Sequence, residues 1–507
     1  MDKFKRFAIL SLILLVGLFL RLWVSHYKLA FIDYDPFYHA RIAEYIYEHG
    51  ALPRWDPREL GGIPYYYPPS FHIVMALSKY VFQQLNFLEI GSYLNIFFGI
   101  LSIPLLYLLT KDEFDIQVAM LAAILLAVSP ALVFRTTLWA RPNGLNIFLP
   151  ILTVFVFSKL RRDLDIKWYI TAVFVSILYV FSHSFVILTL AIVWIAILSE
   201  GNRKSIFATT SIIFITSIIG YLYYYRFVPF LNLSFSPDSW GYTVEYQPLI
   251  SISLRNLTIA KMLSFDFYYW GSYLSFYHLS VGLLLIIFGG LPLMYKRGHN
   301  FFLILTLFSL LSVFFKVNVT MAFLFMFCIA IAIAISDISY RTRKMRDGGE
   351  VMWGWSLAIT LILIFVLGSV FLTSKMRSAE FIWNTDIVRE VLIDVPLHSN
   401  NTIIANDPDL GHEIVYYSDA NTFNSDLTDV KAWGKHMKVY EMLRDTDFTV
   451  PQAVDIMKEN GIDHLLLVYD NQTQIFPFAR GAITPYFTLV NERSIGNRTA
   501  RLYRVTQ

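Results

Sequence analysis

Long apolar runs are the feature that most restricts how this chain can fold. Stretches long enough to cross a hydrocarbon core of ~30 Å recur from the N-terminus to about residue 373. Only 16% of the residues are charged, whereas soluble proteins have about 25%. The sequence therefore predicts a polytopic α-helical membrane protein with about 11 to 13 spans. The clearest runs lie at 7–24, 90–109, 118–134, 145–157, 168–182, 185–198, 206–225, 274–295, 301–315, 321–335 and 353–372.

The charges of the short loops orient these spans, because cytoplasmic loops carry an excess of Lys and Arg. If the further apolar stretch 70–87 does not cross, the basic loops all share the side of the basic N-terminus. We therefore predict a cytoplasmic N-terminus, an uncleaved first span, and a helix at 70–87 in the outer interface. The loops 25–69 and 226–273 then lie outside, together with everything from residue 374.

The composition changes near residue 373, where Asp, Glu, Asn and Pro return. Residues 402–405 and 464–469 are predicted to form buried strands, and residues 451–460 an amphipathic helix that Gly461 ends. We therefore divide the chain into a membrane domain, 1–373, and an extracytoplasmic α/β domain, 374–507.

Charge and cysteine content exclude several classes of protein. The net charge of +3 comes from 41 basic and 38 acidic residues, which excludes a nucleic-acid binder driven by bulk electrostatics. The single cysteine, Cys328, excludes an intramolecular disulfide and a thiolate metal cluster. The sequence has no glycine-rich phosphate loop, no His-Glu-x-x-His and no Gly-x-Ser-x-Gly, so soluble nucleotide-binding and hydrolase functions have no motif in support.

The first outer loop carries the residues best suited to chemistry. Asp33, Asp35 and His39 follow a span closely, so a hard divalent cation could be bound there by oxygen ligands within reach of a lipid phosphate. An aspartate before Pro36 is also a common helix start, and we assign Asp33 to that structural role. His39 is equally consistent with a packed polar residue and with a metal ligand.

Two other features of this loop have structural interpretations. Arg41 is expected to form an ion pair with a nearby acid. The three tyrosines at 65–67 are expected to anchor the loop at the membrane interface rather than to stack on a sugar, because tyrosine side chains favour headgroup depth.

Residues 34–41, Tyr-Asp-Pro-Phe-Tyr-His-Ala-Arg, resemble the first acidic motif of oligosaccharyltransferase catalytic subunits. These membrane enzymes of the type C glycosyltransferase superfamily move a glycan from a polyprenyl carrier to asparagine. Further matches follow in the family's order, so the resemblance spans nearly the whole chain. These further matches lie at 111–114, 129–130 with Arg135, 243–248, 407–414, 419–423, 453–457 and 463–468.

The resemblance implies which residues perform the reaction. Asp35 and Glu245 are the expected catalytic acids, which would bind the N–H groups of the acceptor or accept its proton. The same two acids, together with His39, are the expected ligands of a divalent cation, Mg or Mn. Such a cation would neutralise the charge that develops on the leaving phosphate.

The remaining expected contacts are to the donor and the acceptor. Arg141 and Arg135 are expected near the outer surface, where they would bind the donor phosphate; a lipid headgroup is an equal alternative for Arg135. The acceptor is expected to contact Glu245, Asp409 and Gly411.

The chain also departs from the family pattern. Where the family has its second acidic motif, residues 140–143 read Ala-Arg-Pro-Asn and contain no carboxylate, so one metal ligand is missing or is replaced by Asn143 or His39. Asp407 and Pro408 replace the tryptophan pair that reads the glycosylation sequon, which leaves Asp409 and Gly411 of that motif. The arginine that the family places on a late span has no clear counterpart near residues 316–320.

These observations predict a metal-dependent membrane glycosyltransferase that moves a sugar or oligosaccharide from a polyprenyl-phosphate or -diphosphate carrier to an acceptor at the outer membrane face. Protein asparagine is the leading acceptor. A transporter or flippase of lipid-linked sugars is one alternative, but the spans are almost free of acids and no repeat is visible. An inactive homologue that binds lipid-linked glycan is the other, and the change at 140–143 favours it.

Overall fold

The computed structural model describes most of the two predicted domains. The described residues are 3–25, 35–56, 63–65, 67–137, 140–183, 186–200, 202–224, 285–312, 317–344, 363, 367, 385–405, 410–423, 450–470, 486–496 and 498–506. Asp33, Glu245, Asp409 and the predicted domain boundary at 373 lie outside them.

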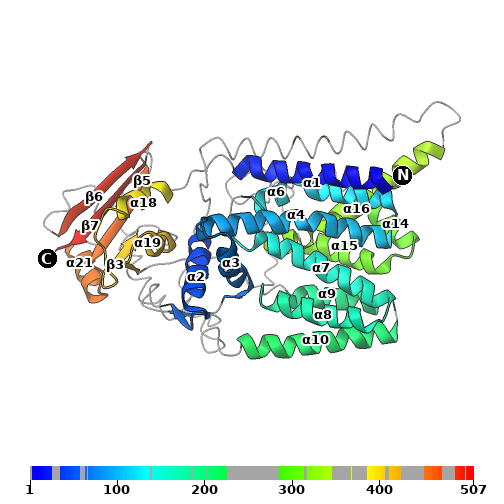
Figure 1. The fold of residues 1–507 in the computed structure, drawn as a ribbon, viewed down its shortest axis with the longest axis horizontal. Coiled ribbons are helices and arrows are strands. Elements are labelled where there is room, and N and C mark those ends of the chain that lie inside the picture. The colour runs from blue at the N-terminus through cyan, green and yellow to red at the C-terminus, as the bar shows by residue number, and fades with distance from the viewer. Residues whose placement is uncertain are drawn as a thin grey trace.

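The first part of the chain forms a bundle of apolar helices that run side by side (Figure 1). Apolar helices occur in each predicted run up to residue 335, whereas the run 353–372 is described only at positions 363 and 367. In the part of the chain that the structure describes, α1, α4, α7 and α10 are long and apolar enough to cross a membrane. The bundle contains α1 (Lys3–Ser25), α4 (Phe87–Glu113), α5 (Ile116–Val128), α6 (Pro130–Arg135), α7 (Asn143–Arg162), α8 (Ile166–Val180), α9 (Val186–Leu198), α10 (Arg203–Tyr224), η5 (Ile286–Gly290), α14 (Leu291–Lys296), α15 (Asn300–Ser312) and α16 (Val317–Lys344).

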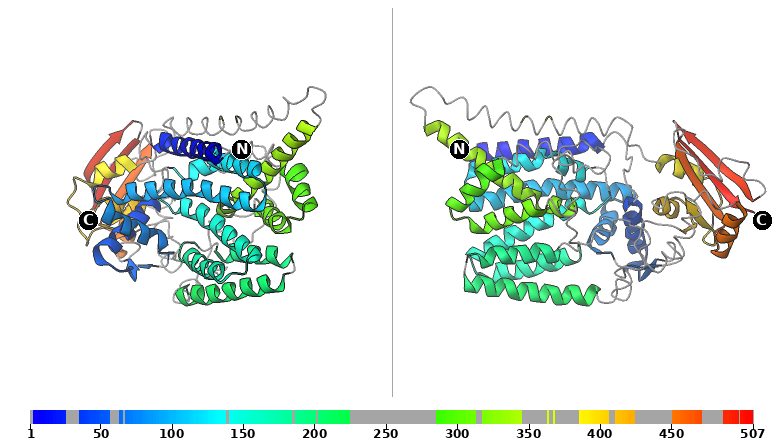
Figure 2. Two further views of the ribbon diagram at one scale, coloured as in Figure 1. Left: turned by 45° about the vertical axis from the view of Figure 1, so that its right-hand side comes forward. Right: turned by 180° about the vertical axis from the view of Figure 1, so that it is seen from behind.

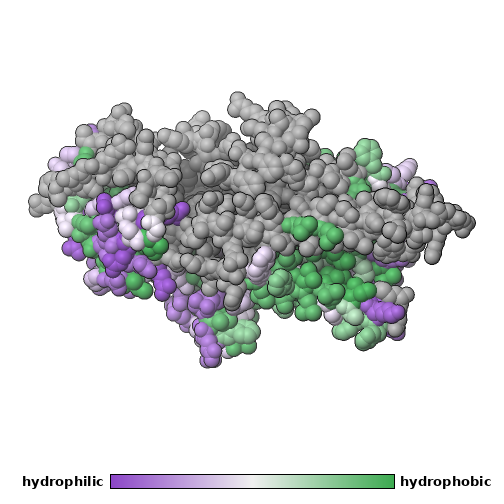
Figure 3. All heavy atoms as spheres, turned by 90° about the horizontal axis from the view of Figure 1, so that it is seen from above, coloured by the Kyte–Doolittle hydropathy of each residue, from purple (hydrophilic) through white to green (hydrophobic). Residues whose placement is uncertain are grey.

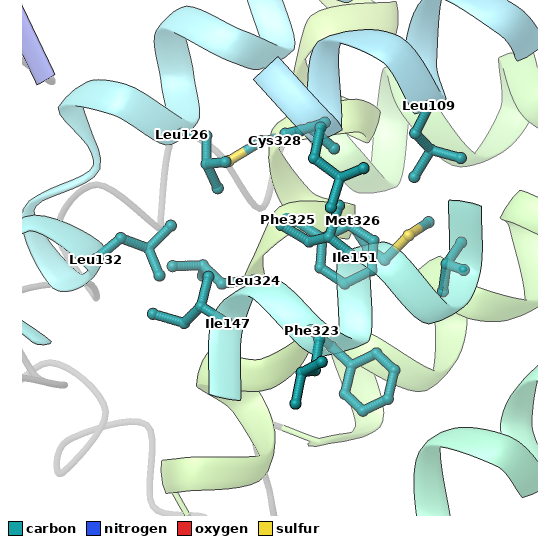
Figure 4. Packing of buried hydrophobic residues seen from close by; sticks show 14 of the residues in the cluster. Leu109, Leu126, Leu132, Ile147, Ile151, Phe323, Leu324, Phe325, Met326 and Cys328 are labelled. Atoms are coloured by element: carbon teal, nitrogen blue, oxygen red, sulfur yellow. The ribbon is translucent and has the colours of Figure 1, made fainter. Parts of the chain in front are cut away.

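Large apolar side chains fill the spaces between these helices. Figure 4 shows part of this buried core, where side chains of α4, α5, α6, α7 and α16 meet, among them Leu109, Leu126, Leu132, Ile147 and Phe325. Many other large apolar side chains point outward from the bundle, including Phe4, Phe207 and Phe288. Among the described residues on the face shown in Figure 3, hydrophobic ones gather over the bundle and hydrophilic ones are more frequent toward the end with the sheet. An outward apolar surface of this kind suits a lipid environment.

A glycine lets α7 approach α4 closely near the start of α7. A Cβ at Gly144, in the first turn of α7, would overlap the backbone oxygen of Asn95 on α4. The Gly144 N–H also donates a hydrogen bond to Asn95 Oδ1. The start of α7 is therefore held directly against the backbone of α4, a packing that only glycine permits.

Gly144→Ala should therefore lower the stability by about 1–3 kcal/mol, because the added methyl group has a backbone atom in its way. The measurement is the thermal unfolding midpoint in detergent. Gly220→Ala is the control, because a Cβ there would lie 3.5 Å from Val180, an ordinary contact, and alanine favours a helix. A midpoint for Gly144→Ala at or above that of Gly220→Ala would contradict this packing.

Two helices lie across the end of the bundle that faces the sheet, namely α2 (Asp35–His49) and α3 (Ser70–Val81), as Figures 1 and 2 show. The predicted helix at 70–87 is observed over its first 12 residues and ends at Val81. That this stretch does not cross the membrane stays a prediction. A two-stranded antiparallel ribbon, β1 (Trp55–Asp56) with β2 (Ile63–Pro64), lies in the chain between the two helices.

The C-terminal part forms a five-stranded sheet in the order β4-β3-β5-β7-β6. β3 pairs in parallel with β4 and β5, and β7 pairs antiparallel with β5 and β6. The predicted strands at 402–405 and 464–469 and the predicted helix at 451–460 are confirmed, and Gly461 has φ +68°. The elements are α18 (Thr385–Leu392), β3 (Thr402–Ala405), α19 (Gly411–Tyr417), β4 (Asn421–Thr422), α21 (Val450–Glu459), β5 (His464–Asp470), β6 (Phe487–Ile495) and β7 (Arg498–Val505).

Side chains that alternate along the strands give this sheet two cores. Ile403 and Leu466 pack with residues of α18 and α19, whereas Ile404, Leu465 and Leu467 pack with α21. Successive side chains of a strand point to opposite faces, so one run of apolar residues serves both layers. The helix α19 thereby comes to lie between the sheet and α2.

Candidate active site

The N-terminal turn of α2 places Asp35 at the centre of the candidate site. Asp35 is the first residue of α2, and its carboxylate forms an ion pair with the guanidinium of Arg141. The Arg141 side chain is 12% exposed and that of Asp35 is 39% exposed, so the pair lies at the edge of a buried region. Two predicted site residues, separated by more than a hundred positions, are thus in direct contact.

His39 lies one helical turn after Asp35 and belongs to a buried chain of hydrogen bonds. His39 Nδ1 lies 2.7 Å from His72 Nε2, and the hydroxyl of Tyr65 lies 2.8 Å from His72 Nδ1. All three side chains are buried. The expectation that the tyrosine run anchors at the interface is therefore wrong for Tyr65, and the ring of Tyr67 packs 4.9 Å from that of His39.

Burial, and then the positive charges of Arg141 and His412, hold the pKa of His39 well below its usual value of 6.5. The imidazole is therefore neutral at neutral pH, and the hydrogen bond to His72 joins two uncharged rings. Two charged rings at this distance would repel each other.

The pH dependence of stability should reflect this neutral histidine. In the unfolded chain His39 takes up a proton near pH 6.5, whereas the folded state does not, so the unfolded state binds more protons. The stability contribution is complete above pH 6.5 and decreases as the pH falls. His39→Gln should flatten the fall in thermal midpoint between about pH 7.5 and about pH 5.5. His49→Gln, an exposed residue of the same helix, is the control, and equal falls in both variants would contradict this origin.

The helix α19 brings the C-terminal part of the chain to the same site. His412 and Glu413 are buried, and the His412 ring lies 5.6 Å from that of Tyr38 on α2. Phe37 packs against Tyr416 and Tyr417, each at 5.3 Å. Gly411, predicted to contact the acceptor, is the first residue of this buried helix. His412 is not among the site residues predicted from the sequence, although it directly follows Gly411.

Arg135 and the turn before α7 are held by α4. Asn95 Nδ2 donates a 3.0 Å hydrogen bond to the carbonyl oxygen of Arg135, and a Cβ at Gly91 would overlap Ala140. Arg135 itself is buried. These contacts fix the segment that carries Arg141 and place it beside Asp35.

Arg21 is a further buried charge, which was not predicted from the sequence. It lies near the end of α1, and its Nε donates a 2.7 Å hydrogen bond to Thr136 Oγ1. Its Nη1 donates to the carbonyl oxygens of Gly17, at 2.9 Å, and Ala127, at 3.2 Å. An arginine inside an apolar run was the available signal, because such a charge in a membrane segment needs buried partners.

Arg41 forms an ion pair with Asp56 on β1, with Nη2–Oδ2 at 2.6 Å and Nη1–Oδ1 at 2.8 Å. The prediction that Arg41 pairs with a nearby acid is confirmed. This two-point contact ties the ribbon to α2 and lies close to the site.

The comparisons with known proteins identify the family. Residues 5–281, more than half of the chain, match the family described as oligosaccharyl transferase STT3, N-terminal. The chain belongs to the STT3 family. A curated relative, subunit STT3B of the dolichyl-diphosphooligosaccharide–protein glycosyltransferase of Arabidopsis thaliana, is 24% identical over 185 residues. That match covers 33% of this chain and only 25% of the plant protein.

Solved structures of type C glycosyltransferases share the fold of this STT3-family chain. The Archaeoglobus fulgidus oligosaccharyltransferase, tethered to an acceptor peptide with an NVT sequon, matches with a TM-score of 0.65 at 15% identity, covering 92% of this chain and 69% of that one. ArnT from Cupriavidus metallidurans, bound to undecaprenyl phosphate, matches with a TM-score of 0.60 at 12% identity, covering 99% and 98%. The fold is therefore that of multi-span membrane glycosyltransferases.

A divalent cation is implied for this family, and one structure of the A. fulgidus enzyme is a complex with Zn and sulfate. A hard cation such as Mg²⁺ takes about six oxygen ligands. No group of three His, Cys, Asp or Glu side chains that could hold a metal occurs within the described residues. Asp35 is already paired with a guanidinium, so the described donors fit such a cation poorly. Glu245 lies outside the described residues, so its role as a ligand stays a prediction.

Proposed function

We propose that this chain transfers a sugar or oligosaccharide from a polyprenyl phosphate or diphosphate to an acceptor. The observation that carries the proposal is the ion pair between Asp35 and Arg141 beside buried histidines, at the end of the bundle where α2, the start of α7 and α19 meet. A carboxylate and a fixed cation at one point suit a reaction in which one reactant loses a proton and the other gains negative charge.

The donor phosphate is proposed to bind beside Arg141. The guanidinium offers several N–H donors in a plane, which matches the oxygens of a phosphate. Arg141 lies two residues before the first residue of α7, and the positive end of a helix dipole attracts anions. Arg135, buried nearby, is proposed to support this segment and the charge of the phosphate. The dolichol-phosphate and undecaprenyl phosphate bound in related structures support a lipid-linked donor.

The acceptor is proposed to be an asparagine in a peptide or protein. Relatives in solved structures hold an inhibitory peptide or a peptide with an NVT sequon. Glu245 and Asp35 would bind the acceptor amide, and Asp409 and Gly411 would bind the chain that follows it. Because Asp407 and Pro408 stand where the family has a tryptophan pair, we expect the requirement for Ser or Thr in the sequon to be weaker.

The proposed placement in the membrane follows from the loop charges. The N-terminus and the basic loops would lie in the cytoplasm, and the site with the C-terminal domain would lie outside. The unit 374–507 would then supply contacts to the acceptor from outside the membrane domain 1–373.

The test is transfer by the purified full chain with lipid-linked glycan donors. Three fluorescent peptides differ only at the sequon, as Asn-Val-Thr, Asn-Val-Ala and Gln-Val-Thr. Glycosylation of the two asparagine peptides and none of the glutamine peptide is expected. Donor that binds without being consumed under all conditions would instead support the inactive homologue, and donor that crosses a vesicle membrane unchanged would support a transporter.

A further inference from the structure

Asp35, the one expected acidic metal ligand that lies within the described residues, is already paired with a cation. Arg141 is paired with Asp35, and its side chain is 12% exposed. An arginine side chain stays protonated at all physiological pH values, so its charge is permanent. A divalent ion at Asp35 would have to displace this guanidinium or lie beside it, with two positive groups sharing one carboxylate.

The surroundings of Arg141 also favour an anion over a second cation. Asn143 Nδ2, a hydrogen-bond donor at the start of α7, is buried and has no acceptor among the described residues. The part of the site around Arg141 thus presents donors and positive charge, which is the arrangement that binds phosphate oxygens.

We propose that the Arg141 guanidinium performs the role of a divalent cation here, so that this chain transfers its glycan without a bound metal. This inference rests on the proposed function and specifies the group that stabilises the leaving phosphate. Arg141 neutralises the leaving phosphate, and Asp35 both holds Arg141 in place and receives the proton of the acceptor.

The reaction step balances with these two residues alone. The acceptor nitrogen or oxygen forms a bond to the anomeric carbon of the sugar, and the bond from that carbon to the phosphate oxygen breaks with its electron pair staying on the oxygen. The acceptor's proton moves to the Asp35 carboxylate. Once Asp35 is neutral it holds Arg141 less strongly, so the guanidinium, which stays protonated, can donate more fully to the phosphate oxygen.

A metal-binding measurement tests this inference independently of activity. Binding of Mn²⁺ to the purified full chain, followed by electron paramagnetic resonance, should be undetectable at sub-millimolar metal in the wild type. Arg141→Asp adds a carboxylate beside Asp35 and removes the guanidinium, so it should bind Mn²⁺ at least about tenfold more tightly. Tight Mn²⁺ binding by the wild type would overturn the inference.

Transfer assays in chelator provide the second test. Wild-type transfer should continue at its full rate in excess EDTA and should not rise with added Mn²⁺ or Mg²⁺. Arg141→Gln should reduce transfer by about 10²–10³-fold without rescue by metal, and Arg141→Lys, which keeps the charge, should retain more activity. Transfer that stops in EDTA and returns with metal would overturn the inference but keep the proposed function. No transfer with or without metal would count against the proposed function, and Mn²⁺ binding would then decide the inference alone.

Discussion

Asp35→Asn should reduce glycan transfer by about 10²–10⁴-fold while the protein still folds. Asparagine has nearly the shape of aspartate but can neither accept the acceptor's proton at neutral pH nor balance the charge of Arg141. The Arg141 side chain is only 12% exposed, so the loss of charge pairing should lower the thermal midpoint, but by less than the removal of a partner would, because the asparagine amide oxygen can still accept a hydrogen bond from the guanidinium. The measurement is the initial transfer rate at saturating donor and acceptor.

Glu48→Gln is the matched control for this variant. Glu48 lies on the same helix, is exposed, and is well away from the N-terminal turn that carries Asp35. Its transfer rate and thermal midpoint should equal those of the wild type. If Asp35→Asn kept a rate within about threefold of that control, Asp35 would not be the proton acceptor, and the chemistry assigned to the ion pair would have to be abandoned.

Local patterns predicted the elements of this protein better than its contacts. The apolar runs predicted the bundle helices, and β3, β5 and α21 were predictable because period and turn residues are local properties. The β6–β7 hairpin was not predicted. Its strands have largely half-exposed side chains without a clear alternation, so no single face stands out in the sequence.

In the candidate site, too, single residues were easier to predict than their contacts. Asp35 and Arg141 were predicted singly, but their ion pair depends on the packing of α2 against the bundle, which no local pattern specifies. Tyr65 was assigned to the interface because tyrosine commonly lies there. The structure instead buries Tyr65 against His72, and it brings His412 from the far end of the chain to α2. Such partners become apparent only when distant segments meet.

Glu113→Ala should lower the stability by roughly 3 kcal/mol, which is the largest effect that we expect from a change outside the active site. Glu113 is the last residue of α4, at the end of the bundle away from α2, and its side chain is 5% exposed. It accepts hydrogen bonds from Arg161 Nη2 at 2.9 and 3.1 Å and from Ser158 Oγ, and it pairs with Arg162 at 3.2 Å.

The expected loss comes mainly from the arginine that remains. The Arg161 side chain is 10% exposed, and besides Glu113 it pairs with Glu200. Its guanidinium also lies 4.6 Å from the centre of the Phe301 ring on α15. Removing Glu113 leaves this buried cation with one carboxylate instead of two, and a buried charge with too few partners costs more than the pair itself contributes. The thermal midpoint in detergent measures the effect.

Asp394→Asn provides the contrast that separates burial from ion pairing as such. Asp394 pairs with Arg493 at 3.1 Å in the C-terminal part of the chain, but the two side chains are 67% and 40% exposed. Water solvates both partners when such a pair is broken, so the midpoint should stay within error of the wild type. If Glu113→Ala left the thermal midpoint as unchanged as Asp394→Asn, the cluster at the end of α4 would be accessible to water. The network of Glu113, Arg161 and Glu200 would then not stabilise the packing of α4, α7 and α15. Because this end of the bundle lies away from Asp35, transfer by folded Glu113→Ala should match that of the wild type at a temperature well below its midpoint.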